Sequence, residues 1–254
     1  MRLDKYLADA GKGTRSEVKK MIGKGLVTVN GAVQKDPGTR VEPGTDRIVV
    51  LGAESERPSE VGYTQFEYYM LNKPAGIISA SRKNSQRRGE KVPEGEERYA
   101  VDLIRESGKT DLFPAGRLDK DTEGLLLITN DGALAHRMLS PKHHVGKTYY
   151  AELSDALSEE DRVKMEEGLG IGDEKPTLPC TVNMLFNKSC LITITEGRYH
   201  QIKRMFGVFG IRVTYLRRIT FGPLALDAAL SPGEYRPLTA EELSELKDFM
   251  TEEE

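Results

Sequence analysis

The sequence predicts an α+β protein in which a small N-terminal domain precedes a larger one. The chain of 254 residues is long enough for one large core and a small appendage. Helix and strand patterns occur in both parts, and residues 53–62 form a polar, proline-containing stretch without periodicity, which is typical of a linker. We therefore expect a first domain over residues 1–55, a linker over residues 56–62 and a second domain over residues 63–254.

Two short helices and a hairpin are expected in the first domain. Apolar residues recur at helical spacing over residues 3–10, and glycines end this helix. Thr14 and Glu17 form a capping box, which predicts that a second helix begins there. Strand patterns follow at residues 26–29 and 47–51, and Asn30-Gly31 is a favourable hairpin turn after the first of them.

The net charge of −3 conceals two basic segments. Residues 1–35 hold eight Lys and Arg against three Asp and Glu, and residues 197–226 hold six Lys and Arg and no acidic residue. In the second predicted helix, Arg15, Lys19 and Lys20 lie on an arc separate from the apolar stripe. Segregated positive charge of this kind indicates a nucleic-acid-binding protein, and the alternative is a set of solvated faces that bind nothing.

No targeting or membrane segment is recognisable in the sequence. No apolar stretch approaches the ~18 residues of a membrane span, and the N-terminus lacks the apolar core of a secretion signal. We therefore expect a cytoplasmic location and no membrane partner. The two cysteines, Cys180 and Cys190, lie in strand-like runs without a histidine pattern, which favours buried thiols over a zinc site or a disulfide framework.

Residues 116–132 place a carboxylate beside a glycine-rich turn that leads into an apolar run. The run Leu125–Ile128 follows Gly124 and ends in a second turn, as expected of a buried strand. Asp119 stands before this strand and could act as a nucleophile, a general acid or base, or a metal ligand. The alternative is that Asp119 or Asp121 only organises the turn through its own side chain.

Two later segments also combine regular patterns with polar side chains. Residues 147–153 alternate as in a strand, which sends Tyr149 and Tyr150 to opposite faces. In residues 196–206 a strand meets a helix, and Lys203 lies at the margin of its apolar face. The buried stripe expected for this helix consists of Tyr199, Ile202, Met205, Phe206 and Phe209.

Three more segments complete the second domain. Residues 68–76 indicate a strand that stops in a Pro-Gly turn. The charged residues 82–97, from Arg82 to Glu97, indicate an exposed loop. Thr239 and Glu242 form a capping box that opens a last helix.

The first domain resembles the S4 RNA-binding domain over about the first fifth of the chain. The resemblance rests on residues 2–7 (RLDKYL), 14–17 (TRSE) and 25–31 (GLVTVNG). Domains of this kind bind structured RNA by its shape and through phosphate contacts. The resemblance therefore implies RNA-binding roles for Arg15, Lys19, Lys20 and Lys24.

The ordered motifs of the second domain resemble the pseudouridine synthases, specifically the branch that modifies ribosomal RNA and carries an S4 domain. The motifs are residues 71–74 (LNKP), 116–124 (GRLDKDTEG), 147–149 (KTY) and 197–205 (GRYHQIKRM). With the S4 part, the resemblance covers nearly the whole chain. It implies a catalytic domain with a mixed, largely antiparallel sheet flanked by helices, and an enzyme that isomerises uridine without a metal or a cofactor.

The resemblance also implies the roles of three catalytic residues. Asp119 would be the nucleophile, acting on a uridine that has been extruded from its helix. Tyr149 would stack on the detached uracil and take the proton from C5. Lys203 would pair with Asp119, because an opposite charge favours the ionised carboxylate.

Further residues receive supporting roles on the same grounds. Arg117, Arg198 and Arg204 are the expected contacts to phosphates that flank the target uridine. We expect His200 to position its neighbours through a hydrogen bond. Asp121 and Glu123 are expected to be turn or solvent residues rather than a second catalytic carboxylate.

Residues 197–205 and 231–239 look most like the small-subunit branch, which modifies one uridine of 16S rRNA. The expected partner is ribosomal RNA or the assembling small ribosomal subunit, and we expect a monomer that acts in ribosome biogenesis. The alternatives are a 23S rRNA pseudouridine synthase and a non-catalytic ribosome-assembly factor that binds RNA. A glycosidase that uses Asp119 with a second acid is disfavoured by the lack of tryptophan and by the two basic segments.

Overall fold

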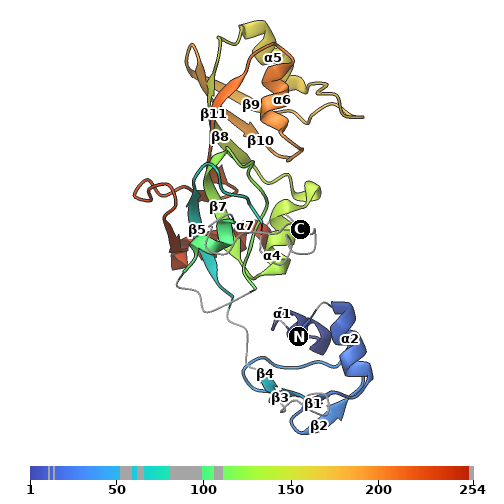
Figure 1. The fold of residues 1–254 in the computed structure, drawn as a ribbon. Coiled ribbons are helices and arrows are strands. Elements are labelled where there is room, and N and C mark those ends of the chain that lie inside the picture. The colour runs from blue at the N-terminus through green and yellow to red at the C-terminus, as the bar shows by residue number, and fades with distance from the viewer. Residues whose placement is uncertain are drawn as a thin grey trace. The chain divides into compact units, whose positions relative to one another are not determined.

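The computed structural model of the protein describes residues 1–10, 12–13, 15–51, 59–61, 66–80, 99–105 and 111–251. The chain divides into two compact units, Met1–Phe66 and Glu67–Glu254 (Figure 1). Each unit has its own buried apolar cluster. In the described part of the chain, every helix is too short or too polar to cross a lipid bilayer.

The first unit packs two helices against a sheet that has four strands within the described residues. Strand order is β2-β1-β3-β4, and every pairing is antiparallel. The elements are α1 (Leu3–Asp9), α2 (Arg15–Gly23), β1 (Val27–Val29), β2 (Ala32–Gln34), β3 (Ile48–Val50) and β4 (Ser59–Val61). The fully buried core side chains are Leu3, Leu7, Val18, Ile22, Val27 and Ile48. Each contributes about 1.5–3 kcal/mol relative to an exposed position.

Asn30 and Gly31 form the predicted hairpin turn between β1 and β2. Both have positive φ angles, 51° and 83°, as a two-residue hairpin loop requires. The Asn30 side chain also accepts a hydrogen bond from the Arg47 backbone amide, which joins the turn to the next strand. The predicted hairpin is therefore confirmed. The predicted capping box of α2 is a separate feature, and its Thr14 lies outside the described residues.

Strand β4 lies within residues 56–62, for which the sequence predicts a linker. It pairs with β3, so this part of the predicted linker belongs to the sheet of the first unit. Val61 is 4% exposed, and its carbonyl accepts a hydrogen bond of 3.0 Å from the Tyr6 hydroxyl. A three-residue strand in polar surroundings has no periodicity to reveal it, which explains why sequence patterns missed it.

The second unit is built on a sheet that contains nine strands within the described residues. Its order is β13-β5-β7-β11-β8-β10-β9, with β6 paired to β7 and β12 paired to β11. The pairing of β7 with β11 is parallel and the other pairings between these strands are antiparallel, which confirms the predicted mixed, largely antiparallel sheet. The strands are β5 (Tyr68–Lys73), β6 (Phe113–Pro114), β7 (Glu123–Thr129), β8 (Lys147–Leu153), β9 (Thr181–Phe186), β10 (Ser189–Ile194), β11 (Val213–Phe221), β12 (Leu224–Ala225) and β13 (Tyr235–Pro237).

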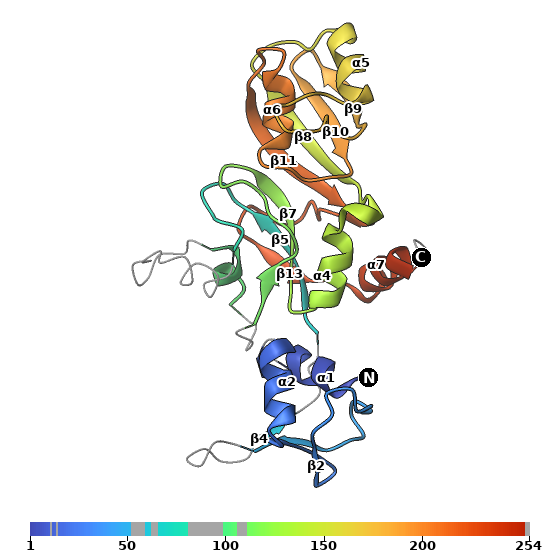
Figure 2. The ribbon, with the colours of Figure 1, turned by 90° about the vertical axis from the view of Figure 1, so that its right-hand side faces the viewer.

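Helices flank both ends of this sheet. Figures 1 and 2 show α5 and α6 beside β8 to β11, and α4 and α7 beside β5, β7 and β13. The helical elements are η1 (Ala100–Leu103), α4 (Gly132–Leu139), η2 (Pro141–His143), α5 (Glu159–Glu167), α6 (Gln201–Gly207) and α7 (Ala240–Thr251). The predicted capping box of α7 is confirmed, because Thr239 Oγ1 accepts from the Glu242 amide and Glu242 Oε2 accepts from the Thr239 amide.

Burial along the strands and at the cysteines of the second unit follows the sequence patterns. β5 and β7 are buried along nearly their whole length, and β8 alternates as predicted, with Tyr149 on its buried face. Cys190 is fully buried and Cys180 is partly buried; burial raises the pKa values of the two thiols to about 11 and about 12. The predicted loop from Arg82 to Glu97 lies outside the described residues.

Tyr199 was predicted in the buried stripe of a helix, and this prediction is wrong. The side chain is 69% exposed. Helix α6 begins only at Gln201, so helical spacing does not apply to Tyr199. Ile202, Met205 and Phe206 lie within the helix and are buried as expected.

Candidate active site

Asp119 lies in a tightly held loop that leads into β7. The preceding residue, Leu118, is bound on both sides by Ser79: the Leu118 amide donates to Ser79 Oγ (3.1 Å), and Ser79 Oγ donates to the Leu118 carbonyl (3.0 Å). The Thr122 amide donates to the Asp119 carbonyl, which closes the turn. The backbone on either side of Asp119 is therefore fixed by local hydrogen bonds.

A buried lysine supports the same loop from β5. Lys73 is fully buried, and its ammonium donates to the carbonyls of Pro74 (3.0 Å), Lys120 (3.3 Å) and Thr122 (2.8 Å). Burial lowers the pKa of Lys73 to about 8, although nearby carboxylates oppose the shift. Lys73 belongs to the motif of residues 71–74, from which no role was predicted for it. Its position at the end of a buried strand was the available signal.

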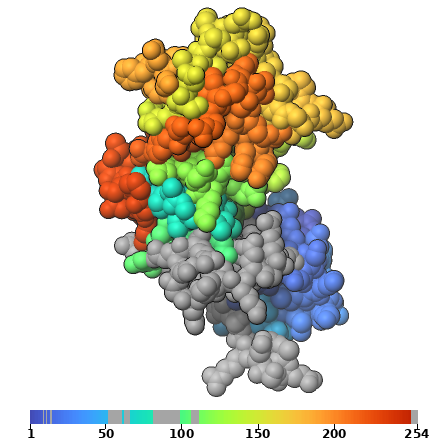
Figure 3. All heavy atoms as spheres, turned by 45° about the horizontal axis from the view of Figure 1, so that its top comes forward, coloured from blue at the N-terminus to red at the C-terminus, as the bar shows by residue number. Residues whose placement is uncertain are grey.

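Helix α6 brings Lys203 to the Asp119 loop. Lys203 Nζ lies 3.4 Å from Asp119 Oδ2 and 2.6 Å from Asp121 Oδ1. His200 Nε2 lies 3.6 Å from Asp119 Oδ1. The Asp119 and Lys203 side chains are 28% and 23% exposed, so both are largely enclosed but reachable. In Figure 3 the orange surface of the segment that contains α6 adjoins the green surface of the segment that contains β7.

Asp121 is 72% exposed, as expected of a turn or solvent residue, and it also pairs with Lys203. Its carboxylate takes the shorter of the two Lys203 contacts, and this hydrogen bond lowers the pKa of Asp121. Lys203 therefore forms ion pairs with two carboxylates, those of Asp119 and Asp121. Glu123 is bound elsewhere: it accepts a hydrogen bond of 2.7 Å from the Tyr215 hydroxyl in β11. Burial, together with this hydrogen bond, raises the pKa of Tyr215 to about 12.

Tyr149 lies on β8, opposite Ile192 in β10 and Arg218 in β11. Its ring is 7% exposed and belongs to the same buried cluster as Leu118 and Ile202, which are the chain neighbours of Asp119 and Lys203. The core cluster that contains Tyr149 thus also contains a chain neighbour of Asp119 and one of Lys203. The catalytic roles of Asp119, Tyr149 and Lys203 remain predictions.

A glycine makes this strand arrangement possible. Gly124 begins the buried part of β7 with φ +99°, and a Cβ atom there would lie 2.2 Å from the Arg218 carbonyl oxygen. Only glycine permits this approach of β7 to β11. Gly124 therefore allows β7, which follows the Asp119 loop, to lie close to β11, the strand in which Arg218 is opposite Tyr149.

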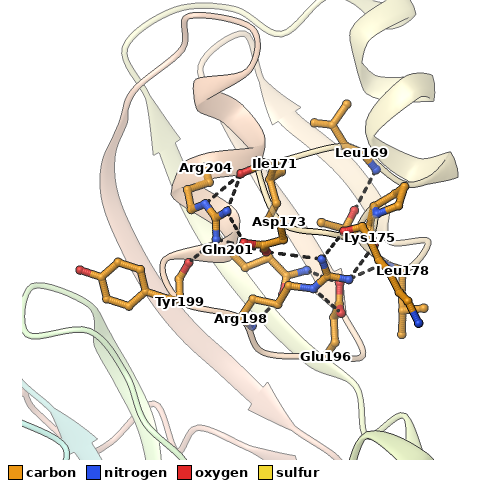
Figure 4. Close-up of polar contacts among 12 residues, drawn as sticks. Leu169, Ile171, Asp173, Lys175, Leu178, Glu196, Arg198, Tyr199, Gln201 and Arg204 are labelled. Atoms are coloured by element: carbon orange, nitrogen blue, oxygen red, sulfur yellow. Dashed lines mark hydrogen bonds and ion pairs between the residues drawn. The ribbon is translucent and has the colours of Figure 1, made fainter.

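Arg198 and Arg204 bind the protein itself rather than projecting into solvent (Figure 4). Arg198 donates to the Lys175 and Pro176 carbonyls, each at 2.6 Å, and pairs with Glu196. Arg204 donates to the carbonyls of Ile171 and Tyr199 and pairs with Asp173 at 2.6 Å. Hydrogen bonds from both arginines lower the pKa of Asp173. We name these residues, Asp173, Glu196, Arg198 and Arg204, the arginine network.

The contacts of the arginine network bear on the predicted phosphate-binding role of Arg198 and Arg204. Arg198 and Arg204 were predicted to hold RNA phosphates, but their donors are already engaged by carbonyls and carboxylates. A phosphate would have to displace or share these contacts. Their contacts instead connect residues 171–176 to the start of α6, where His200 precedes the helix and Lys203 lies in its first turn. Arg117, in contrast, is exposed in the Asp119 loop.

Two family models match the chain. The S4 domain model matches residues 1–46, and the model of the RNA pseudouridylate synthases matches residues 67–207. The chain belongs to the RNA pseudouridine synthase family. It is 44% identical over 253 residues to an uncharacterized RNA pseudouridine synthase of Bacillus subtilis, covering 98% of this chain and 99% of the relative.

Further relatives and a solved structure agree with this assignment. A ribosomal small subunit pseudouridine synthase A of Vibrio vulnificus is 40% identical, covering 96% of this chain and 98% of the relative. A crystal structure of a pseudouridylate synthase superposes with a TM-score of 0.65 at 35% identity, covering 97% of this chain and 99% of that one. This pseudouridine synthase is therefore an isomerase that modifies RNA, with an S4 domain before its catalytic domain, as predicted.

The predicted RNA-binding cations of the S4 domain are accessible in this pseudouridine synthase. Arg15, Lys19 and Lys20 of α2 and the following Lys24 are exposed, opposite the buried Val18 and Ile22. This is the arrangement that a phosphate-binding helix face requires. In the described part of the chain, no group of three or more His, Cys, Asp or Glu side chains is arranged to hold a metal ion.

Proposed function

We propose that this pseudouridine synthase converts one uridine of 16S ribosomal RNA to pseudouridine, with Asp119 as the nucleophile. The observation that carries the proposal is the Asp119 carboxylate, held in a fixed loop beside the Lys203 ammonium at 3.4 Å. Relatives that match nearly the full length are named ribosomal small subunit pseudouridine synthase A, which supports 16S rRNA as the substrate. The partner is ribosomal RNA or the assembling small subunit, in the cytoplasm.

The proposed reaction is a balanced isomerisation. The N1–C1′ bond of the uridine breaks, the uracil turns, C5 bonds to C1′, and the proton lost from C5 is matched by a proton gained at N1. The uridine must leave its helix first, at a cost of a few kcal/mol. Asp119 attacks the nucleotide and is released again when C5 bonds to C1′. The ring of Tyr149 supports the detached uracil, and its phenolic oxygen accepts the C5 proton.

Lys203 has an electrostatic role in this proposal. Its ammonium lies 3.4 Å from Asp119 Oδ2, where its charge is opposite to that of the carboxylate. Because Asp121 binds the same ammonium at 2.6 Å, the second carboxylate also holds Lys203 in place. Lys73 and Ser79 contribute by fixing the backbone that carries Asp119.

Mapping of pseudouridines in ribosomal RNA tests the proposal directly. RNA from cells that lack this protein should miss one pseudouridine in 16S rRNA, and complementation with the wild-type chain should restore it. Complementation with Asp119→Asn should not restore it. A missing site in 23S rRNA would overturn the choice of subunit, and restoration by Asp119→Asn would overturn the role of Asp119.

A further inference from the structure

Tyr199 presents an exposed aromatic ring between β10 and α6. The side chain is 69% exposed, and its ring stacks on the imidazole of His200 with centroids 3.9 Å apart and an interplanar angle of 15°. In Figure 4 the ring points away from the arginine network. A large aromatic ring held at this exposure buries little area by itself, so its position calls for a partner.

The backbone that carries this ring is held firmly. His200 has φ 48° and ψ 35°, a left-handed conformation that is uncommon outside glycine and that recurs at functional sites. Arg204 Nη1 donates to the Tyr199 carbonyl (3.2 Å), and the Arg204 amide donates to the His200 carbonyl (2.9 Å). Arg204 of the arginine network thus holds the backbone from which the Tyr199 ring projects.

The stacked pair leads directly to the candidate nucleophile. His200 Nε2 is 3.6 Å from Asp119 Oδ1, so the covered side of the Tyr199 ring lies against a residue that contacts Asp119. Tyr199 therefore lies at the margin of the active site. Lys203, in the first turn of α6, approaches the same carboxylate.

Phe186 shows that exposure alone does not distinguish Tyr199. Phe186 is 79% exposed at the end of β9, more than Tyr199. It has no stacked partner among the ring pairs of the described residues, whereas Tyr199 is stacked against a residue of the active site. The combination of a held ring, a stacked support and a position beside Asp119 is what indicates a ligand.

We propose that Tyr199, supported by His200, is the stacking platform for an RNA base that flanks the target uridine. Bases of single-stranded or opened RNA stack on aromatic rings regardless of their identity. Tyr149, at 7% exposure, suits the enclosed uracil, whereas the open Tyr199 ring suits a base that stays outside. The proposal rests on the proposed function, because it takes the substrate to be RNA bound around Asp119.

Binding of RNA to an inactive enzyme tests the platform. Asp119→Asn protein is titrated with an RNA that contains the mapped uridine and 2-aminopurine beside it, and the dissociation constant is followed by fluorescence quenching. Adding Tyr199→Ala should weaken binding about 5- to 150-fold, as expected for loss of one stacked base. Tyr199→Phe should restore binding, because the ring is kept, and Phe186→Ala serves as the matched exposed-aromatic control without effect.

RNAs that lack single bases complete the test. If Tyr199 stacks on a flanking base, removing that base should weaken binding to the same extent and should abolish the effect of Tyr199→Ala. If Tyr199→Ala weakens binding equally for every such RNA, the platform is overturned. The same holds if Tyr199→Ala in the otherwise active enzyme lowers only kcat. Because these measurements use binding and not turnover, failure of Asp119 as the nucleophile would appear separately, as activity in the Asp119→Asn protein.

Discussion

The α2 face of the first unit and the arginines around α6 in the second carry similar charge but use it differently. On α2, Arg15, Lys19 and Lys20 are exposed on the side opposite the buried stripe. Around α6, Arg198 and Arg204 bind carbonyls and carboxylates of their own unit. The difference teaches that the charge of a segment does not by itself indicate an RNA-binding surface. The exposed α2 cations keep their predicted role, whereas Arg198 and Arg204 hold their own unit together.

Arg218 extends the same contrast into the core. Its side chain is 1% exposed, its Nε donates to the Leu125 carbonyl at 2.8 Å, and its guanidinium lies 4.8 Å from the centroid of Phe221. Much of the positive charge of residues 197–226 is therefore structural. Lys203, in contrast, approaches the candidate nucleophile Asp119, so this pair is where we propose that positive charge supports the reaction.

Replacement of that carboxylate should have the largest effect. We expect Asp119→Asn to reduce pseudouridine formation by more than about a hundredfold, because a neutral amide cannot act as the nucleophile. RNA binding should be largely retained, since the cations of α2 are untouched. Tritium release from 5-tritiated uridine RNA measures turnover, and residual activity above about a tenth of wild type would contradict the assignment.

The buried lysine at the Asp119 loop should give a pH-dependent stability. The pKa of Lys73 is lowered to about 8, so between about pH 8 and 10.5 the unfolded state binds more protons than the folded state. The contribution of this group to the free energy of unfolding should therefore rise with pH in that range. Urea unfolding should show that Lys73→Met loses part of this rise, whereas the exposed-lysine control Lys20→Met keeps it; equal slopes in all three proteins would argue against a buried, shifted lysine.

The arginine network should matter for stability where the α2 cations do not. Arg204→Met removes hydrogen bonds to Ile171, Asp173 and Tyr199 and should lower the free energy of unfolding by about 1.5–3 kcal/mol. Arg15→Met should change it by less than about 0.5 kcal/mol. Thermal and urea denaturation of both variants measure the difference, and equal stabilities would break the comparison.

RNA affinity should show the opposite ranking. Replacing Arg15, Lys19 and Lys20 together by Gln should make the negative slope of log K against log salt shallower by about 2–3. Each lost phosphate contact removes about 0.7–0.9 from the magnitude of this slope. A triple Gln variant at Lys142, Lys164 and Lys188 of the second unit is the matched control. If the control alters the slope as much as the α2 variant does, the RNA-binding surface lies outside α2.

Removal of the second carboxylate should have the smallest effect. Asp121→Asn leaves Lys203 to Asp119 alone, so we expect kcat to change by less than about fivefold, as is usual when an exposed partner of an ion pair is lost. The Lys203 contact holds the pKa of Asp121 low, so wild type and variant should differ above that pKa and converge as Asp121 becomes protonated at acid pH. A loss of about a hundredfold would show that Asp121 itself takes part in the reaction.

The regular elements and the site motifs could be predicted from the sequence because their signals are local. Periodicity identified β5, β7 and β8, a dipeptide identified the hairpin turn at Asn30, and reciprocal capping residues identified the start of α7. The features that escaped prediction are nonlocal. The pairing of β4 with β3 and the internal partners of Arg198 and Arg204 depend on residues that lie elsewhere in the chain.

The sequence by itself determined the two-part organisation, the family and the candidate carboxylate Asp119, because motif order and periodicity are properties of the chain. Only the tertiary structure decided which charges meet. Lys203 is separated from Asp121 by 82 positions along the chain, yet their side chains are 2.6 Å apart. Contacts of this kind arise when the sheet brings α6 and the Asp119 loop together. The strength of such a contact depends on the distance between the two charges, and a local sequence pattern contains no information on the distance between residues far apart in the chain.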